Sequence, residues 1–187
     1  MKVTSEMLGN LHGSVRQIER SGIRIRNFAG LTLYEELNPF LLAENLGMKV
    51  INITSVPNLS AKNVQTLLIN KAMEWSGASS GVLDDGSVLI VLNPSQSRLR
   101  QRATLMEEIC HVLLGHQRDS LSLDQKGRTY HSNQESEAYA VGAAALLPYV
   151  ALKKYRAQGL SDTDIASLFK VSRSLVNYRF KITSLES

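Results

Sequence analysis

The sequence is poor in cysteine and in long apolar runs. Cys110 is its only cysteine among 187 residues. One thiol cannot form an intrachain disulfide, and it excludes a zinc site built from several cysteines. No apolar run reaches the roughly 18 to 20 residues that a membrane-spanning helix needs. The first twenty residues lack the apolar core of a signal peptide, so we expect a cytoplasmic protein with no membrane partner.

Strong charge of one sign is also absent. The formal net charge is only +4, and the basic residues are scattered. This excess gives weak support to a nucleic-acid partner. The length suffices for one well-packed core with a small appendage.

The order of predicted elements indicates an α+β fold. Asn38-Pro39 favours a helix start and Gly47 its end, and a β-branched strand is expected over 48–54. Asp84-Asp85-Gly86 separates two short apolar runs, which is typical of a β-hairpin. We therefore predict a small, mostly antiparallel sheet covered by helices.

The most regular helix is predicted over 97–114 and ends before Gly115. It contains Glu107, Glu108 and His111, which form an E-E-x-x-H pattern one substitution away from the zincin motif H-E-x-x-H. At about 100° per residue, these three side chains share one side of the helix. Glu107 and His111 are therefore candidate metal ligands, with Glu108 beside them. By itself the pattern also fits a solvated acidic face with a structural histidine.

A third ligand must come from another element, and Glu137 is the leading candidate. It lies near the start of the helix predicted over 134–147. Small residues follow it and would permit close packing against the His111 helix; they are Ala138, Ala140, Gly142, Ala143, Ala144 and Ala145.

Two segments together resemble the ImmA/IrrE family of metallopeptidases. The family has a helix like "ftLaHELgHlllGH", and this chain has TLMEEICHVLLGH from Thr104 to His116. The family then has a segment like "EreAnaFAaeLLmP", and this chain has ESEAYAVGAAALLP from Glu135 to Pro148. The C-terminal segment from Ile165 to Ser172 is similar to the family's "iAerFgVS".

The resemblance implies a zincin-like α+β peptidase core over residues 1–150 and a helix-turn-helix-like extension over 151–187. It also implies that Glu108 acts as the general base and that His111 and Glu137 bind zinc. Family members act on transcription repressors of phages, mobile elements or stress regulons, so the expected partner is a helix-turn-helix repressor.

Glu107 departs from the family pattern because it stands where the first histidine should be. Glu107, His111 and Glu137 can still form a three-ligand set for Zn²⁺. An oxygen-richer set would favour a harder ion such as Mn²⁺. The opposite possibility is a site without metal whose paired glutamates share a proton, in a catalytically silent protein that binds its partner.

The remaining candidate residues have plainer interpretations. Cys110 is expected to be a small core residue rather than a nucleophile. His131, in a polar loop, is a weaker candidate to replace the missing histidine. His12 and His116 have no convergent partners in the sequence, and Trp75 is expected in the core.

The C-terminal segment predicts two helices around Val171-Ser172. The first has a Ser161/Asp164 capping box, and the second carries the polar residues Arg173, Asn177, Arg179 and Lys181. This fits a helix-turn-helix, and the favoured interpretation is a brace or a partner-docking unit rather than a DNA reader. Three functions thus remain open, namely a metallopeptidase, a silent binding protein and a DNA-binding regulator.

Overall fold

The computed structural model describes residues 13–56, 59–70, 75–116 and 132–184. The chain divides into two compact units, one formed by residues 38–135 and the other by residues 1–37 with 136–187. They are named here the sheet unit and the helical unit. The division at residue 150 that the sequence suggested concerns functional domains and stays a prediction.

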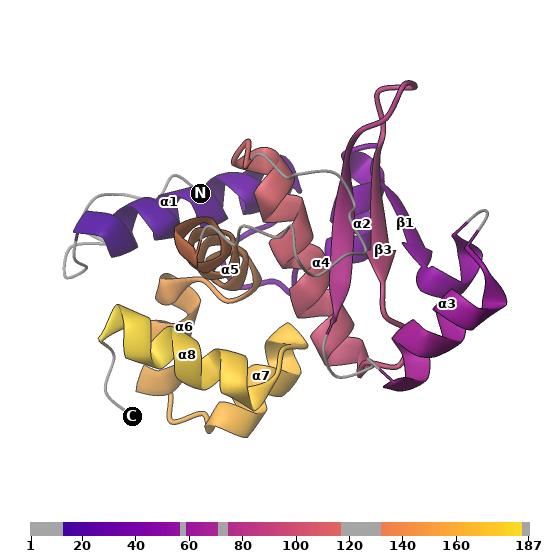
Figure 1. Ribbon diagram of the computed structural model, residues 1–187. Helices are drawn as coiled ribbons and strands as arrows, with labels where there is room; N and C mark the ends of the chain where they lie inside the picture. Colours follow the sequence, from indigo (N-terminus) through magenta and orange to yellow (C-terminus); the bar gives the residue numbers. More distant parts are fainter. Residues whose placement is uncertain (1–12, 57–58, 71–74, 117–131, 185–187) are drawn as a thin grey trace. The chain divides into compact units, whose positions relative to one another are not determined.

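The sheet unit has a three-stranded sheet in the order β1-β3-β2 (Figure 1). Its strands are β1 (Lys49–Asn52), β2 (Gly77–Val82) and β3 (Val88–Leu92). β2 and β3 form the predicted hairpin, whereas β1 pairs with β3 in parallel, with Lys49 opposite Leu89. The α+β class is confirmed, but the sheet is mixed rather than mostly antiparallel. The reason is that β1 does not join β3 by a tight turn; the chain between them includes β2.

The strand predicted before Asp84-Asp85-Gly86 covers only Gly81 to Leu83, whereas β2 starts four residues earlier, at Gly77. Its first residues, Gly77 to Ser80, are small and have low strand propensity. Packing explains why they nonetheless form a strand: a Cβ added at Gly77 would lie only 2.7 Å from Thr104 Cγ2. The absence of a side chain therefore lets this strand lie directly on the helix that carries the candidate site.

Helix boundaries in the sheet unit follow the local signals. Helix α2 (Pro39–Asn45) is capped by Asn38, whose Oδ1 accepts from the Phe40 N–H at 3.1 Å. Helix α4 (Arg98–Leu113) begins after Ser97, whose hydroxyl accepts from the Arg100 N–H. α4 packs against β2 and β3, and α2 packs against α4 and β1. The remaining segments are a 3-10 turn η2 (Ile53–Ser55), the short helix α3 (Ala61–Gln65) and a π-helical turn η3 (Thr66–Asn70).

The helical unit contains α1 (Gly13–Phe28), α6 (Tyr149–Ala157), α7 (Asp162–Phe169), α8 (Arg173–Thr183) and most of α5 (Ser132–Leu146). α1 and α5 approach closely at Gly22, where an added Cβ would meet the backbone of Ala144 at 2.8 Å. The predicted capping box starts α7, since Ser161 and Asp164 exchange side-chain and backbone hydrogen bonds. Among the described residues, no helix combines the length and apolarity needed to cross a membrane.

Buried charges hold the helical unit together. Glu19 and Arg179 form an ion pair, with exposed fractions of 1% and 0%. Glu19 also accepts from the Tyr149 N–H at 2.9 Å, and Arg179 Nε donates to the Leu147 carbonyl. Arg26 is likewise buried and donates to three backbone carbonyls, those of Thr32, Glu35 and Ala145. Burial lowers the pKa of Arg26 to about 10, so this side chain stays charged at neutral pH.

Candidate metal centre

The second half of α4 presents its polar residues together, as its periodicity predicts. Glu107 and His111 are one helical turn apart and Glu108 lies beside Glu107. His111 and Glu108 are buried, with exposed fractions of 2% and 6%, whereas Glu107 is half-buried. Carboxylates and an imidazole withdrawn from water require compensation by hydrogen bonds, protons or a cation.

Glu135, in the first turn of α5, completes a three-residue cluster. One ligand atom from each of Glu107, His111 and Glu135 lies within 4.8 Å of the other two. His111 Nε2 lies 3.4 Å from Glu135 Oε1. All three residues belong to the sheet unit. Two carboxylates and one imidazole are a ligand set that divalent zinc and manganese accept.

The electrostatics of Glu107 show that the negative charge of this carboxylate is poorly compensated. Its pKa is raised from an ordinary 4.5 to about 7. Burial is the main cause, and the negative charges of Glu108 and Glu135 add to it. His111 and Arg100 offset only part of this rise. A positive charge bound among these groups would therefore be favourable.

His111 provides the test of whether the residues fit a metal. Its Nε2 atom is buried and makes no hydrogen bond within the described part of the chain. A buried polar nitrogen without a partner is costly, and it is rare in native proteins unless a ligand or an ion satisfies it. This nitrogen lies beside the Glu135 carboxylate, and Glu107 completes the cluster. The site therefore offers both the ligand atoms and the excess negative charge that a cation requires.

His116 lies beside His111, contrary to the prediction that it had no convergent partner. The helical wheel placed its side chain on the opposite side, but the helix ends at Leu113 and Gly115 adopts a φ of +69°. The chain therefore turns back, and the two imidazole rings meet with their centroids 5.1 Å apart. His116 is not a member of the three-residue cluster.

The family model for the IrrE N-terminal-like domain, Peptidase_M78, matches residues 62–181. The chain belongs to this peptidase family. No curated protein matches this chain. The matched region contains Glu107, Glu108, His111 and Glu135. Family membership and the Glu-His-Glu cluster are together compatible with a divalent metal.

For the third ligand, the sequence analysis and the structure point to different glutamates. The predicted ligand Glu137 is exposed and belongs to the helical unit, so its role stays a prediction. Glu135 is the residue that the structure brings to His111. The two glutamates are separated by about 200° around α5, so both cannot face the same way. The sequence did contain a signal for Glu135. This residue is the first of the segment that resembles the family, and it matches the glutamate with which the family segment begins.

Other candidate residues are placed as follows. Cys110 is fully buried on α4, and burial raises the pKa of its thiol, with the charge of Glu107 adding to the rise. This environment suits a core residue rather than a nucleophile. Trp75 is half-buried, and its indole donates to the Leu67 carbonyl. His12 and His131 lie outside the described residues.

The C-terminal helices keep part of the predicted polar surface. Arg173, Asn177 and Lys181 are exposed on α8. Arg179 is not available to a partner, since it forms the buried ion pair with Glu19. The expectation that α8 presents Arg179 was therefore wrong. The periodicity of α8 missed this because a buried arginine can only be recognised once its carboxylate partner, 160 residues away, is known.

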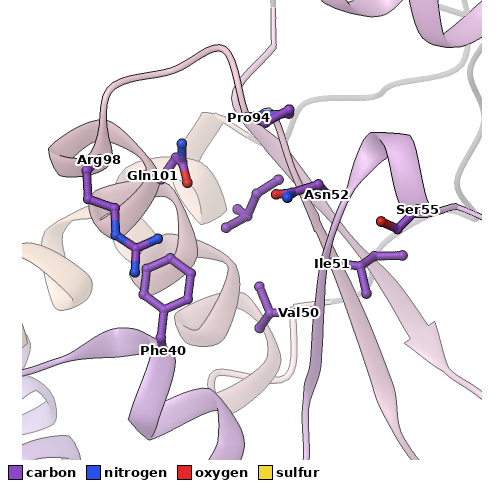
Figure 2. A pocket seen from close by; sticks show the side chains of 9 residues that line it. Phe40, Val50, Ile51, Asn52, Ser55, Pro94, Arg98 and Gln101 are labelled. Atoms are coloured by element: carbon purple, nitrogen blue, oxygen red, sulfur yellow. The ribbon is translucent and has the colours of Figure 1, made fainter.

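A pocket of about 460 Å³ opens at the other end of α4 (Figure 2). Apolar and polar residues both line it, and the polar groups come from Asn52, Ser55, Arg98 and Gln101. The Arg98 guanidinium lies 3.9 Å above the centre of the Phe40 ring. Among the residues that the structure describes, no carboxylate lines it. About 9 Å of helix rise separates Gln101 from Glu107, so the pocket and the cluster occupy different turns of one helix.

Proposed function

We propose that this protein is a metal-dependent endopeptidase that cleaves a protein partner. Glu107, His111 and Glu135 would hold the ion, which is Zn²⁺ or a harder cation such as Mn²⁺. The observation that carries the proposal is the buried His111 Nε2, which has no hydrogen bond to any described residue and lies 3.4 Å from a Glu135 oxygen. Membership in a peptidase family supports hydrolysis as the reaction.

Glu108 is the candidate general base. It is buried on α4 next to Glu107, and its charge contributes to the raised pKa of Glu107. A bound divalent cation would supply Lewis-acid polarisation of the scissile carbonyl. Glu108 would take a proton from the attacking water as the new C–O bond forms. It would return that proton to the amine nitrogen as the C–N bond breaks.

The partner that we propose is a helix-turn-helix transcription repressor, as the family resemblance implies. The pocket beside Phe40 is a candidate subsite for one of its side chains. Its mixed polar and apolar lining, together with the Arg98 guanidinium, favours a neutral or acidic group.

Metal content tests the ligand set directly. The protein would be purified without chelator or affinity metal and analysed beside His111→Ala, Glu135→Gln and Glu137→Gln. We expect near-stoichiometric metal in the parent and in Glu137→Gln, and its loss from the other two variants. Retention in Glu135→Gln with loss in Glu137→Gln would instead establish Glu137 as the third ligand.

Cleavage tests the reaction. Candidate repressors incubated with the metal-loaded protein should be cut, and Glu108→Gln should lower the rate by about 10² to 10⁴ without changing metal content. Unchanged cleavage by Glu108→Gln would remove Glu108 from the mechanism.

A second function is favoured by one specific observation, the raised pKa of Glu107. Near pH 7 about half of this carboxyl is protonated, so the cluster can persist without an ion. In that form the protein would bind a repressor without cutting it. Metal bound by Glu107→His, together with an empty parent, would favour this alternative.

A further inference from the structure

The end of α4 is built so that His116 meets His111. Gly115 donates to the Val112 carbonyl at 3.1 Å, and the His116 N–H donates to the His111 carbonyl at 3.0 Å. These two hydrogen bonds, with a positive φ at Gly115, define a Schellman motif. The motif usually brings together apolar side chains at these two positions. Here two imidazoles occupy them, and their backbone placement is fixed by the motif.

The ring nitrogens of this pair are within hydrogen-bond distance. His111 Nδ1 and His116 Nδ1 are 3.1 Å apart. A hydrogen bond between two imidazole nitrogens needs one donor and one acceptor, so one of the two atoms carries the proton. The tautomer of His111 is therefore coupled to that of His116.

The environment of the other ring nitrogen, Nε2, indicates which tautomer of His111 can bind a metal. Nε2 is the atom that lies beside the Glu135 carboxylate and has no hydrogen bond among the described residues. A metal-binding nitrogen must offer a lone pair, so the ring proton must then sit on Nδ1. Ligand histidines generally donate this second N–H to an acceptor that fixes the ring.

We propose that His116 is a positioning residue that accepts a hydrogen bond from His111 Nδ1–H and so holds His111 Nε2 ready for a cation. This inference rests on the proposed function, because it assigns His116 a role at the same site. It does not make His116 a ligand. His116 acts on the metal only through His111.

Two variants separate the hydrogen bond from packing. His116→Leu keeps a side chain in the Schellman contact but removes the acceptor. His116→Asn supplies an amide oxygen close to where Nδ1 lies. We expect His116→Leu to lower the affinity for Zn²⁺, measured by chelator competition, by about 10- to 100-fold. His116→Asn should restore most of it. Equal affinity in the parent and His116→Leu would overturn the proposal.

A second readout does not depend on metal. Two-bond ¹H–¹⁵N spectra of the metal-free protein report the tautomer of each of its four histidines. We expect the Nδ1–H form at His111 in the parent and in His116→Asn, and a mixture in His116→Leu. The Nε2–H form at His111 in the parent would overturn the role of His116. If the parent binds no metal yet shows the Nδ1–H form, the peptidase proposal fails while the positioning of His111 stands.

Discussion

Glu19 and Glu107 are both carboxylates withdrawn from water, one in each compact unit. They differ in the charge of the side chains around them. Glu19 faces the Arg179 guanidinium and the Tyr149 N–H. Glu107 faces two further carboxylates, and its pKa is raised to about 7. Among the described residues, the first cluster leaves only Arg179 Nη1 without a hydrogen bond, and the second leaves His111 Nε2.

The difference separates a structural site from a candidate functional one. In the helical unit, Glu19 and Arg179 carry opposite charges that offset each other, so the pair does not require a bound ion. In the sheet unit, three acidic side chains gather near one imidazole, and their mutual repulsion favours a bound cation. A buried charge is thus evidence of function only when its own chain fails to compensate it.

The largest expected effect on stability comes from breaking the buried ion pair between Glu19 and Arg179. Arg179→Met leaves Glu19 buried without its cation, and we expect it to lower the free energy of unfolding by about 3 to 5 kcal/mol. Urea denaturation followed by circular dichroism measures this. The matched control is Lys170→Gln, which breaks the more exposed ion pair with Glu36 and should cost less than about 1 kcal/mol. Equal costs for the two variants would contradict the contrast.

The unbalanced cluster should make the metal-free protein less stable as pH rises. Below about pH 4.5 Glu107 is protonated in both folded and unfolded chains. Between 4.5 and about 7 the folded state holds the proton and the unfolded state loses it, so the stability that this proton provides is lost as pH rises through 7. The loss amounts to about 3 kcal/mol at most.

Glu107→Gln isolates this contribution. Its stability, measured in chelator from pH 4.5 to 8, should fall less steeply than that of the parent, because the amide does not titrate. Glu137→Gln, at an exposed carboxylate, should keep the parental slope. A parental slope in Glu107→Gln would mean that another group causes the pH dependence.

A bound divalent metal should offset the negative charge of the Glu107 cluster and so stabilise the folded protein. Zn²⁺ or Mn²⁺ at about one hundred times its dissociation constant should stabilise the parent by about 2.7 kcal/mol. Thermal unfolding with and without the ion measures the shift. His111→Ala should lose it. A similar shift in both proteins would place the ion elsewhere.

The smallest effect is expected at the pocket. Phe40→Ala removes the ring under Arg98 and should weaken partner binding by about 1 kcal/mol, measured by titration calorimetry. Metal content should not change, because the pocket and the cluster lie on different turns of α4. Loss of metal in Phe40→Ala would show that the two regions are coupled.

Signals within single segments of the sequence determined several helix starts, the shared side of α4 and the family resemblance. Asn38-Pro39, Ser97 and the Ser161/Asp164 box predicted helix starts that the structure confirms. The shared side of α4 also followed from the sequence, because helical periodicity is a property of the segment itself. The resemblance to the peptidase family, found in two motifs, is confirmed by the family match.

Only the tertiary structure decided the contacts between distant segments. It brought Glu135 to His111 and buried Arg179 against Glu19. It also made a strand of the small residues after Gly77. Each outcome depends on how one segment is rotated or packed against another. A two-residue shift on a helix turns a side chain by about 200°, and no pattern within one segment records which rotation its neighbour will meet.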